Sequence, residues 1–305
     1  MSNIIDLAIN ENGGNKKHPC FGSNAHMYAR MHVPVAPKCN ISCNYCNRKY
    51  DCINESRPGV TSSVLSPKEG LELFRAVREK VENLKVVGVA GPGDALCDFE
   101  KTKQTVELIR EEAADVSFCL STNGLLLPKY AFQLIGMGIE YVTITINAVD
   151  PEIGRLVYRN VRLEGQTLEG REGAEVLMAN QLEGLRFLAK NGVVCKVNIV
   201  MIKGVNDTHV DEIVKTVRDR GAYIANIMPL IPTEGTPFAN ISALSKEELH
   251  AARMRCSQYL KQMHHCRQCR ADAIGTLDND RSVEFRNLGC MAEPKTKAPK
   301  KEMVL

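Results

Sequence analysis

The sequence lacks the segments that would place a protein in a membrane or direct it out of the cell. No apolar run in its 305 residues approaches the roughly 20 residues that a membrane-spanning helix needs. The N-terminus, Met-Ser-Asn-Ile-Ile-Asp, has no pattern of a secretory signal peptide. We therefore expect a cytoplasmic protein with no membrane partner.

A strong excess of charge of one sign is also missing. The chain has 39 lysines and arginines against 36 aspartates and glutamates, a formal net charge of +3, and the basic residues are spread along it. Extended nucleic-acid surfaces depend on clustered positive charge. The sequence therefore predicts no nucleic-acid partner.

Cysteine, by contrast, is plentiful, with 12 residues. Disulfide bonds are a poor explanation for them, because the chain is long and has no secretory segment. Metal ligation in a reducing compartment explains them better.

Three of these cysteines, Cys39, Cys43 and Cys46, form a C-x3-C-x2-C triplet, with Tyr45 just before the last thiol. Three thiolates can hold three irons of a cubane cluster, whereas a cluster that only transfers electrons usually has four protein ligands. An open iron indicates that a small molecule binds there, as an open position does in a catalytic metal site. Zinc is one alternative, although zinc sites usually add a second pair or histidines. A ferredoxin-like electron carrier is the alternative that is not an enzyme.

Strand and helix patterns alternate about six times after the first 31 residues. The expected strands are 32–36, 85–90, 116–121, 140–146, 193–200 and 223–229, and the expected helices are 67–82, 99–113, 128–137, 150–158, 173–190, 208–220 and 246–263. This alternation predicts a parallel sheet with helices outside it, and six units are too few for the eight-unit barrel. We therefore predict an α/β fold, a partial (βα)6 TIM-type barrel with two arms.

The arms precede and follow the predicted barrel. The expected parts are an N-terminal arm at 1–31, the barrel at 32–230, a C-terminal helix and arm at 231–290 with a short hairpin within 270–290, and a disordered tail at 291–305. Inside the barrel, the polar stretch 159–173 is expected to be an excursion loop.

Polar residues follow three of the predicted strands, at the strand ends where function collects in such folds. They are Gly91, Pro92, Gly93 and Asp94 after 85–90, Thr122 and Asn123 after 116–121, and Asn147 after 140–146. The glycines permit a close backbone approach to a ligand, and Asp94 can accept a hydrogen bond from an ammonium group. An ordinary tight turn is the alternative for the glycine loop. The other three side chains can bind hydroxyl or carboxylate groups.

Together, the triplet, the partial barrel and the glycine loop resemble the radical S-adenosylmethionine superfamily over about residues 32–230. The resemblance implies that the amino and carboxylate groups of S-adenosylmethionine chelate the open iron. It also implies that one electron from the cluster cleaves the sulfonium, giving methionine and a 5′-deoxyadenosyl radical.

Further motifs between about residues 18 and 290 resemble the NifB family of nitrogenase cofactor maturases. They are His18-Pro-Cys-Phe21, Met31-His-Val-Pro-Val-Ala-Pro37, Cys46-Asn-Arg-Lys-Tyr-Asp-Cys52, Glu55-Ser-Arg-Pro-Gly59, Ala90-Gly-Pro-Gly-Asp94 and His265-Cys-Arg-Gln-Cys-Arg-Ala-Asp272. Longer members of that family append a NifX-like carrier domain, so we expect the short, stand-alone form.

This second resemblance implies a lyase-class radical enzyme that fuses two [4Fe-4S] clusters, with an added sulfur and a central carbide, into the [8Fe-9S-C] precursor of the nitrogenase cofactor. One S-adenosylmethionine would methylate a cluster sulfide, and a second would yield the radical that abstracts hydrogen from that methyl group. The implied partners are an iron–sulfur cluster donor, an electron donor and a scaffold or carrier of the NifEN or NifX type. A peptide-modifying radical enzyme with auxiliary clusters is the alternative.

The resemblance also assigns ligands to three [4Fe-4S] clusters. They are Cys39, Cys43 and Cys46 for the S-adenosylmethionine-binding cluster, His26, Cys52 and Cys119 for one donor cluster, and Cys20, Cys266 and Cys269 for the other. Few thiolates per cluster, with a histidine among them, would favour release of the donor clusters. His18 and His32 compete with His26, and Glu55 is a candidate additional ligand or proton carrier.

Not every cysteine receives a cluster. Cys195 and Cys256 are expected to be core residues, because one lies within a strand and the other within a helix. Cys97 and Cys290 receive no role. A zinc site made by the three thiols of the arms and a histidine is the alternative to the second donor cluster.

Overall fold

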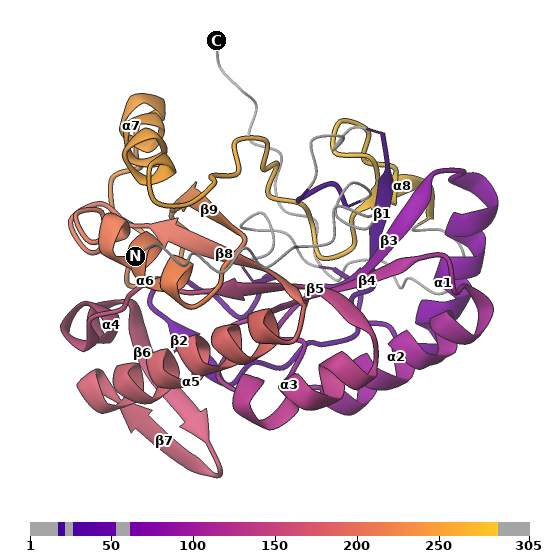
Figure 1. The fold of residues 1–305 in the computed structure, drawn as a ribbon, viewed down its shortest axis with the longest axis horizontal. Helices are drawn as coiled ribbons and strands as arrows, with labels where there is room; N and C mark the ends of the chain where they lie inside the picture. The colour runs from indigo at the N-terminus through magenta and orange to yellow at the C-terminus, as the bar shows by residue number, and fades with distance from the viewer. Residues whose placement is uncertain (1–17, 22–26, 53–61, 286–305) are drawn as a thin grey trace, which may run out of the picture.

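The fold is built on a curved seven-stranded sheet (Figure 1). We examined it in a computed structural model, which describes residues 18–21, 27–52 and 62–285. In sheet order, the strands are β10 (Ile274–Gly275), β1 (Ala29–His32), β3 (Leu84–Val89), β4 (Ser117–Thr122), β5 (Ile139–Thr145), β8 (Val194–Met201) and β9 (Ile224–Pro229). All neighbours are parallel except β10, which is antiparallel to β1. The six parallel strands form an open sheet, which confirms the predicted partial barrel.

Helices cover the outer face of this sheet (Figure 1). They are α1 (Pro67–Lys80), α2 (Phe99–Glu112), α3 (Leu127–Gly136), α4 (Pro151–Val157), α5 (Gly170–Lys190), α6 (Val210–Asp219), α7 (Lys246–Ser257) and α8 (Ser282–Phe285). The start of α1 shows why the predicted boundaries hold. The Ser66 hydroxyl accepts from the Glu69 N–H at 3.3 Å, and the Glu69 carboxylate accepts from the Ser66 N–H at 2.7 Å, a capping box completed by Pro67 at the first helical position.

Side chains alternate between the two faces along each parallel strand. Val87, Phe118 and Val197 belong to the main hydrophobic core, which the helices cover. The residues between such positions face inward. They are Arg30, His32, Gly88, Cys119, Tyr141, Thr143, Thr145, Lys196, Asn198 and Asn226. The inner face therefore carries the polar, charged and thiol groups that chemistry needs.

Two predicted segments were wrong. The first strand spans Ala29–His32 rather than 32–36. The excursion loop predicted at 159–173 is a hairpin of β6 (Tyr158–Leu163) and β7 (Gln166–Glu169), and β6 pairs on its other side with β2 (Ile41–Cys43) in a second sheet. The hairpin turn is Glu164-Gly165, with φ of 51° and 80°. Such positive angles are typical of two-residue hairpin turns.

The segment after α7 crosses the open side of the barrel, and we call residues 261–275 the strap. At its start, the Lys261 carbonyl accepts from the Ala225 N–H of β9 at 3.0 Å, and the Met263 N–H donates to the Ala225 carbonyl at 2.8 Å. At its end, the Ala273 carbonyl accepts from the His32 N–H of β1 at 2.8 Å, and β10 pairs with β1. Because β1 and β9 are the first and last of the six parallel strands, the strap joins the two ends of the open sheet (Figure 1).

The C-terminal elements differ in detail from those predicted. The helix α7 ends at Ser257 rather than near residue 263. A tight return is present within 270–290, since Gly275 and Asp280 form an antiparallel bridge, but β10 joins the main sheet and α8 follows. The predicted tail at 291–305 lies outside the described residues.

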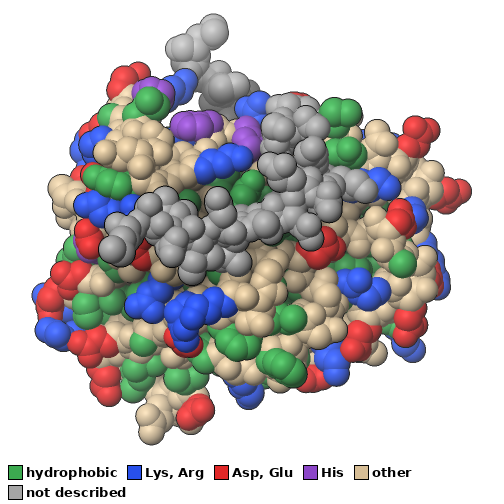
Figure 2. All heavy atoms as spheres, in the orientation of Figure 1, with side chains coloured by type: hydrophobic (Ala, Val, Ile, Leu, Met, Phe, Trp, Pro, Cys, Tyr) green, Lys and Arg blue, Asp and Glu red, His purple; other side chains and the backbone are tan. Residues whose placement is uncertain are grey.

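The distribution of charged side chains on the surface is mixed, as the formal net charge of +3 suggests. Figure 2 shows acidic and basic side chains interspersed on the visible face. In the part of the chain that the structure describes, no helix combines the length and the apolar character needed to cross a membrane.

Candidate functional site

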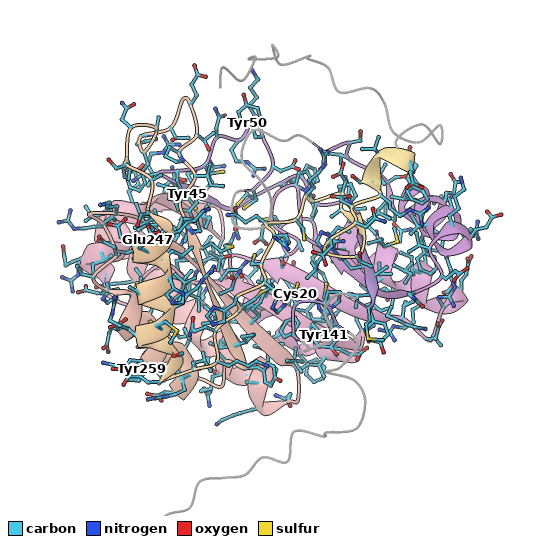
Figure 3. The ribbon with its side chains drawn as sticks, turned by 90° about the horizontal axis from the view of Figure 1, so that it is seen from above. Cys20, Tyr45, Tyr50, Tyr141, Glu247 and Tyr259 are labelled. Atoms are coloured by element: carbon cyan, nitrogen blue, oxygen red, sulfur yellow. The ribbon has the colours of Figure 1, made fainter. Side chains whose placement is uncertain are left out.

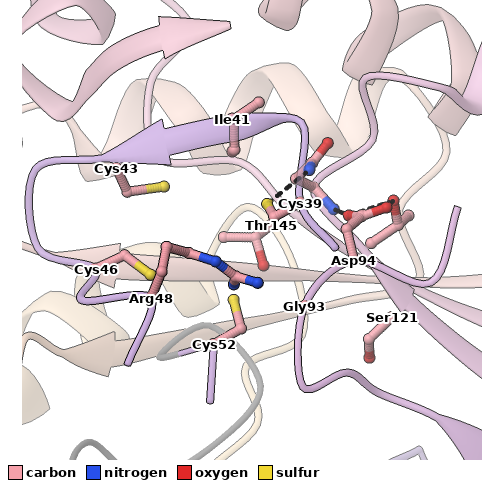
Figure 4. A pocket seen from close by; sticks show the side chains of 12 residues that line it. Cys39, Ile41, Cys43, Cys46, Arg48, Cys52, Gly93, Asp94, Ser121 and Thr145 are labelled. Carbon is pink, nitrogen blue, oxygen red and sulfur yellow. Dashed lines mark hydrogen bonds between the residues drawn. The ribbon is translucent and has the colours of Figure 1, made fainter. Parts of the chain in front are cut away.

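A pocket of about 380 Å³, partly open to solvent, lies where the cysteine triplet meets the ends of the parallel strands (Figure 4). Its lining residues are Cys39, Ile41, Cys43, Cys46, Arg48, Cys52, Gly93, Asp94, Ser121, Thr122, Asn123 and Thr145. The pocket thus contains all three thiols of the triplet, a fourth thiol and most of the polar residues predicted at the strand ends.

The second sheet holds the triplet in place. Cys43 ends β2, which pairs with β6, and the Asn40 carbonyl accepts from the Arg162 N–H at 2.7 Å. The Cys46 N–H donates to the Cys43 carbonyl at 3.1 Å, closing a turn. The hairpin that the sequence did not reveal therefore supports the cysteine loop.

Burial keeps the triplet thiols protonated while no metal is bound. It raises the pKa of Cys39 to about 11, and the charge of Asp94 adds to the shift. Burial likewise raises the pKa of Cys43 well above its usual range and also raises that of Cys46. Metal binding must therefore displace protons from these sulfurs.

The glycine loop packs directly against the cysteine loop. The Gly93 N–H donates to the Ala36 carbonyl at 2.7 Å, and the Asp94 N–H donates to the Lys38 carbonyl at 2.6 Å. A Cβ atom on Gly93 would overlap the Pro37 and Lys38 carbonyl oxygens. Glycine is therefore required at position 93 because the backbone of residues 37–38 packs against it. From the sequence alone, a ligand is expected to make this close approach.

Asp94 ties the β3 and β4 loops together. Its carboxylate accepts from the Thr122 hydroxyl at 3.0 and 3.2 Å, from the Asn123 N–H at 2.6 Å and from the Leu96 N–H at 2.9 Å. The side-chain nitrogen of Asn123 donates to the side-chain oxygen of Asn40 at 2.7 Å. The same nitrogen lies 3.7 Å from Cys39 Sγ. These residues fix the edge of the pocket beside the triplet.

Asn147 serves the interior rather than the pocket. Its side chain is fully buried, its amide nitrogen donates to the Tyr45 hydroxyl at 2.7 Å, and its oxygen accepts from the Val200 N–H at 2.8 Å. It is not among the lining residues. Thr145, two residues earlier, does line the pocket, and its buried hydroxyl has no hydrogen-bond partner among the described residues.

Cys52 and Arg48 complete the outer side of the pocket (Figure 4). The Cys52 N–H donates to the Pro92 carbonyl at 2.9 Å, which anchors this cysteine to the glycine loop. The Arg48 guanidinium donates to the Pro37 carbonyl, and its side chain lies near Cys46 and Cys52. Arg48 lies inside the motif from Cys46 to Cys52, but nothing in the sequence marked it separately as a pocket residue.

The thiols of the two arms come together inside the barrel. Cys20 and Cys266 both pack against a small buried cluster, Phe21, Tyr141, Ile224 and Met263, and Cys119 contacts it too. Figure 3 shows Cys20 near Tyr141 of this cluster. Burial raises the pKa of Cys20, and the charges of Cys269 and Cys266 add to this. Cys266 also packs against the cluster that Cys39 and Cys46 contact, so it lies between the triplet and the inner thiols.

His32 and Cys119 flank Gly88 on the inner face of the sheet. A Cβ atom on Gly88 would lie 2.6 Å from Cys119 Sγ and 3.0 Å from His32 Cδ2. His32 Nδ1 lies 2.9 Å from the Arg270 carbonyl oxygen, which can only accept, so Nδ1 carries the proton. Burial, followed by the charge of Arg30, lowers the pKa of His32 to about 4. At neutral pH, Nε2 therefore has a free lone pair, as a metal-ligating histidine requires.

His18 is held differently. Its Nδ1 accepts from the Cys20 N–H at 3.1 Å, and its ring contacts Phe21 and Tyr141 at centroid distances of 4.7 and 4.5 Å. Its Nε2 is buried and has no partner among the described residues. The predicted ligands His26 and Glu55 lie outside the described residues, as does Cys290.

Three described cysteines, Cys97, Cys195 and Cys256, were not assigned to a cluster. Cys195 and Cys256 are fully buried in the main hydrophobic core, as expected. The Cys97 N–H donates to the Asp94 carbonyl at 3.1 Å, but this cysteine does not line the pocket. Within residues 18–21, 27–52 and 62–285, no three His, Cys, Asp or Glu side chains converge on a point that would hold one metal ion.

Comparisons with known proteins identify the family of this chain. The model of the radical SAM superfamily matches residues 33–217. Among curated relatives, the chain is 49% identical over 276 residues to the FeMo cofactor biosynthesis protein NifB of Klebsiella pneumoniae, covering 89% of this chain and 59% of that protein. It is 48% identical over 275 residues to the protein of the same name from Azotobacter vinelandii, covering 88% and 56%. The chain thus spans less than two thirds of the length of these relatives.

Solved structures share the fold at low sequence identity. Streptococcus suis SuiB bound to S-adenosylmethionine matches with a TM-score of 0.56 and 12% identity, covering 78% of this chain and 50% of that one. Methylornithine synthase (PylB) matches with a TM-score of 0.52 and 14% identity, covering 78% and 65%. At such identities the likeness supports the partial-barrel fold alone.

Proposed function

Because this chain belongs to the radical SAM superfamily, and because the relatives that it resembles are named for FeMo cofactor biosynthesis, we propose that it builds the iron–sulfur precursor of the nitrogenase cofactor. Its substrates would be two [4Fe-4S] clusters, one additional sulfur and S-adenosylmethionine as the carbon source, and its product an [8Fe-9S-C] cluster. The observation that carries the proposal is that Cys266 packs against the hydrophobic cluster beside the triplet and also against the cluster that Cys20 and Cys119 contact.

The triplet fits the superfamily's own cluster. Cys39, Cys43 and Cys46 line one pocket, and the sequence offers no fourth cysteine between them. When bound, this cluster supplies the electron that cleaves S-adenosylmethionine. The partnerless hydroxyl of Thr145 is available to a ligand in the same pocket, and Ser121 and Asn123 add polar groups beside it. Asp94 holds the loops around that ligand by accepting from Thr122 and Asn123.

One substrate cluster would be held by Cys52, Cys119 and a histidine. Cys119 faces inward on β4, and Ser121, two residues further along the same face, lines the pocket that Cys52 also lines. For the histidine, the geometry favours His32, whose ring lies beside Cys119 and whose Nε2 is unprotonated. His26, predicted from the sequence, is the competing ligand.

The other substrate cluster would be held by Cys20, Cys266 and Cys269. Cys266 contacts both the residues around Cys20 and those around the triplet, so the two substrate clusters and the radical source would share one interior. With three protein ligands per substrate cluster, each cluster keeps one iron free of protein. Such partial ligation favours transfer over permanent retention.

The experiment is anaerobic reconstitution of the full chain, followed by S-adenosylmethionine and a reductant. We expect an acid-labile eight-iron cluster that can be extracted, together with 5′-deoxyadenosine. A variant with Cys39, Cys43 and Cys46 replaced by alanine should keep iron at the substrate sites but form no product. A Cys195→Ala variant, altered only in the core, should behave as the parent. If 5′-deoxyadenosine forms while four-iron clusters stay unchanged, a radical enzyme acting on another substrate is the correct description.

A further inference from the structure

The two cysteines of the strap each receive a hydrogen bond from the barrel interior. Arg30 of β1 donates from Nη2 to Cys269 Sγ at 3.1 Å, and Asn226 of β9 donates from Nδ2 to Cys266 Sγ at 3.3 Å. The strap therefore makes a sulfur contact with each end of the open sheet. Neither donor belongs to a motif that the sequence singled out as chemical.

Arg30 is a buried cation whose acceptors are weak for its charge. Arg30 is only 4% exposed to solvent. Nη1 donates to the Gly275 and Thr276 carbonyl oxygens at 2.5 and 2.7 Å, and Nη2 donates to Cys269 Sγ. Nε is buried without an acceptor among the described residues. A buried charge is costly unless an anion compensates it, and no acceptor named here is a carboxylate.

Asn226, on β9 at the other end of the parallel strands, also donates a hydrogen bond to a strap sulfur. It is 1% exposed, and its Nδ2 divides its donation between Cys266 Sγ and the Asn198 side-chain oxygen at 3.1 Å. Its own oxygen is buried without a partner among the described residues. The amide is therefore held with its donor, rather than its acceptor, toward the sulfur.

A further cation lies near the same thiols. Lys196 is buried on the inner face of β8, with its Nζ 5.7 Å from the centre of the Phe21 ring. The positive charges of Lys196 and Arg30 both act to lower the pKa of Cys20, against the larger opposite effect of burial. The thiols of the arms thus lie in a positively charged, desolvated interior, which suits a net-negative cluster.

We propose that Arg30 and Asn226 are positioning residues that fix the two strap sulfurs and raise the reduction potential of the cluster bound by Cys20, Cys266 and Cys269. This inference rests on the proposed function for the identity of that cluster. Hydrogen bonds to ligand sulfurs and nearby positive charge both favour the reduced cluster, because reduction adds negative charge to the iron–sulfur core. The two effects have the same sign, so removal of either donor must lower the potential.

The test is an EPR-monitored redox titration in the full-length chain carrying alanine at Cys39, Cys43 and Cys46. Only the two substrate clusters then contribute, and the cluster of Cys52 and Cys119 serves as an internal reference. The variants are Arg30→Gln, which removes the positive charge and replaces the guanidinium by a shorter amide, and Asn226→Leu, which removes the amide donor and keeps the branched shape of the side chain. The matched control is Arg110→Gln, because Arg110 also has a buried Nε without a described partner but donates to the Gly138 carbonyl rather than to sulfur.

We expect the strap cluster of Arg30→Gln to be at least tenfold harder to reduce, which is about 59 mV for a one-electron couple. Asn226→Leu should shift in the same direction by less, because it removes a dipole and not a charge. The reference cluster and the Arg110→Gln protein should not move. A folded variant that loses only the strap cluster's iron also supports the proposal, since the donor is then needed to hold the sulfur.

Unchanged potentials in both variants, with full iron content, would overturn it. Should Arg30→Gln fail to fold, Asn226→Leu decides alone, because the Asn226 amide donates to Asn198 and Cys266, whereas Arg30 also donates to Gly275 of β10. The titration precedes the addition of S-adenosylmethionine. Failure of the parent chain to form an eight-iron product therefore counts against the proposed function and leaves the potential comparison valid.

Discussion

His32 and Cys119 face each other across Gly88 on three adjacent parallel strands. The backbone register pairs His32 with Gly88 and Gly88 with Cys119, and the absence of a side chain at the central position lets the imidazole and the thiol approach the same space. The strand register thus brings together two of the three residues proposed to hold one substrate cluster.

The first prediction concerns this central glycine. A Gly88→Ala substitution would place a methyl group 2.6 Å from Cys119 Sγ, closer than real Cβ contacts allow, and 3.0 Å from His32 Cδ2, so the thiol must move. We expect the protein to lose the iron of the histidine-ligated cluster, about four irons per chain, while the triplet's cluster remains. Iron analysis and EPR of reconstituted protein measure this. Gly136→Ala, where a Cβ meets nothing within 4 Å, is the control. Equal iron content in the two variants would contradict the prediction.

The identity of the histidine ligand gives a second prediction. His32→Ala should remove the spectrum of one substrate cluster and leave the other two clusters, because His32 Nε2 is the unprotonated nitrogen beside Cys119. His26→Ala is the competing variant. Loss of the cluster in His26→Ala together with its retention in His32→Ala would return the role to His26.

The third prediction is a loss of stability in acid. The folded chain holds His32 with a pKa of about 4 and lowers that of His18 by burial, whereas an unfolded histidine titrates near 6.5. Between these values the unfolded state binds more protons, so stability is full above pH 6.5 and declines as the pH falls toward 4. We expect His32 to account for on the order of 1 to 2 kcal/mol of this loss. Urea unfolding of the metal-free protein at pH 7.5 and 5 measures it, and a His32→Gln variant with an undiminished acid loss would contradict the assignment.

The fourth prediction concerns Thr145. Its buried hydroxyl lines the pocket without a described partner, so a Thr145→Val substitution removes a ligand contact without breaking one inside the protein. A hydrogen bond contributes about 1 kcal/mol, so we expect S-adenosylmethionine to bind about fivefold more weakly to the reconstituted enzyme, with unchanged iron content. Calorimetric titration measures this affinity. Unaltered binding would show that the hydroxyl does not contact the ligand.

The barrel could be predicted from the sequence because its strands and helices follow local rules. Pro67 with the capping serine before it, and apolar strands such as Leu84–Val89, mark their own boundaries. The hairpin β6–β7 could not, because its strands are mostly exposed and polar and its role is to pair with β2. That pairing is a tertiary contact with no signature in either segment alone.

The candidate site divides in the same way. Close spacing in the sequence revealed the triplet and the C-x2-C pair, and strand ends revealed Asp94, Thr122 and Asn123. Asn147 followed the same rule, but its side chain turns toward Tyr45 and Val200. His32 is only a competitor of His26 in the sequence, and strand register places it beside Cys119. Arg30 and Asn226 could not be identified from the sequence, because their contacts with Cys269 and Cys266 depend on the position of the strap.

The central claim is that the clusters beside the triplet are substrates. The most direct measurement uses S-adenosylmethionine labelled with carbon-14 in its methyl group, added anaerobically to the reconstituted and reduced chain, followed by extraction of the iron–sulfur product. We predict that the label migrates with an extractable eight-iron cluster and that Cys266→Ala abolishes this labelled product. Label found only in methionine or in a methylated protein, with both four-iron clusters still bound, would contradict the account.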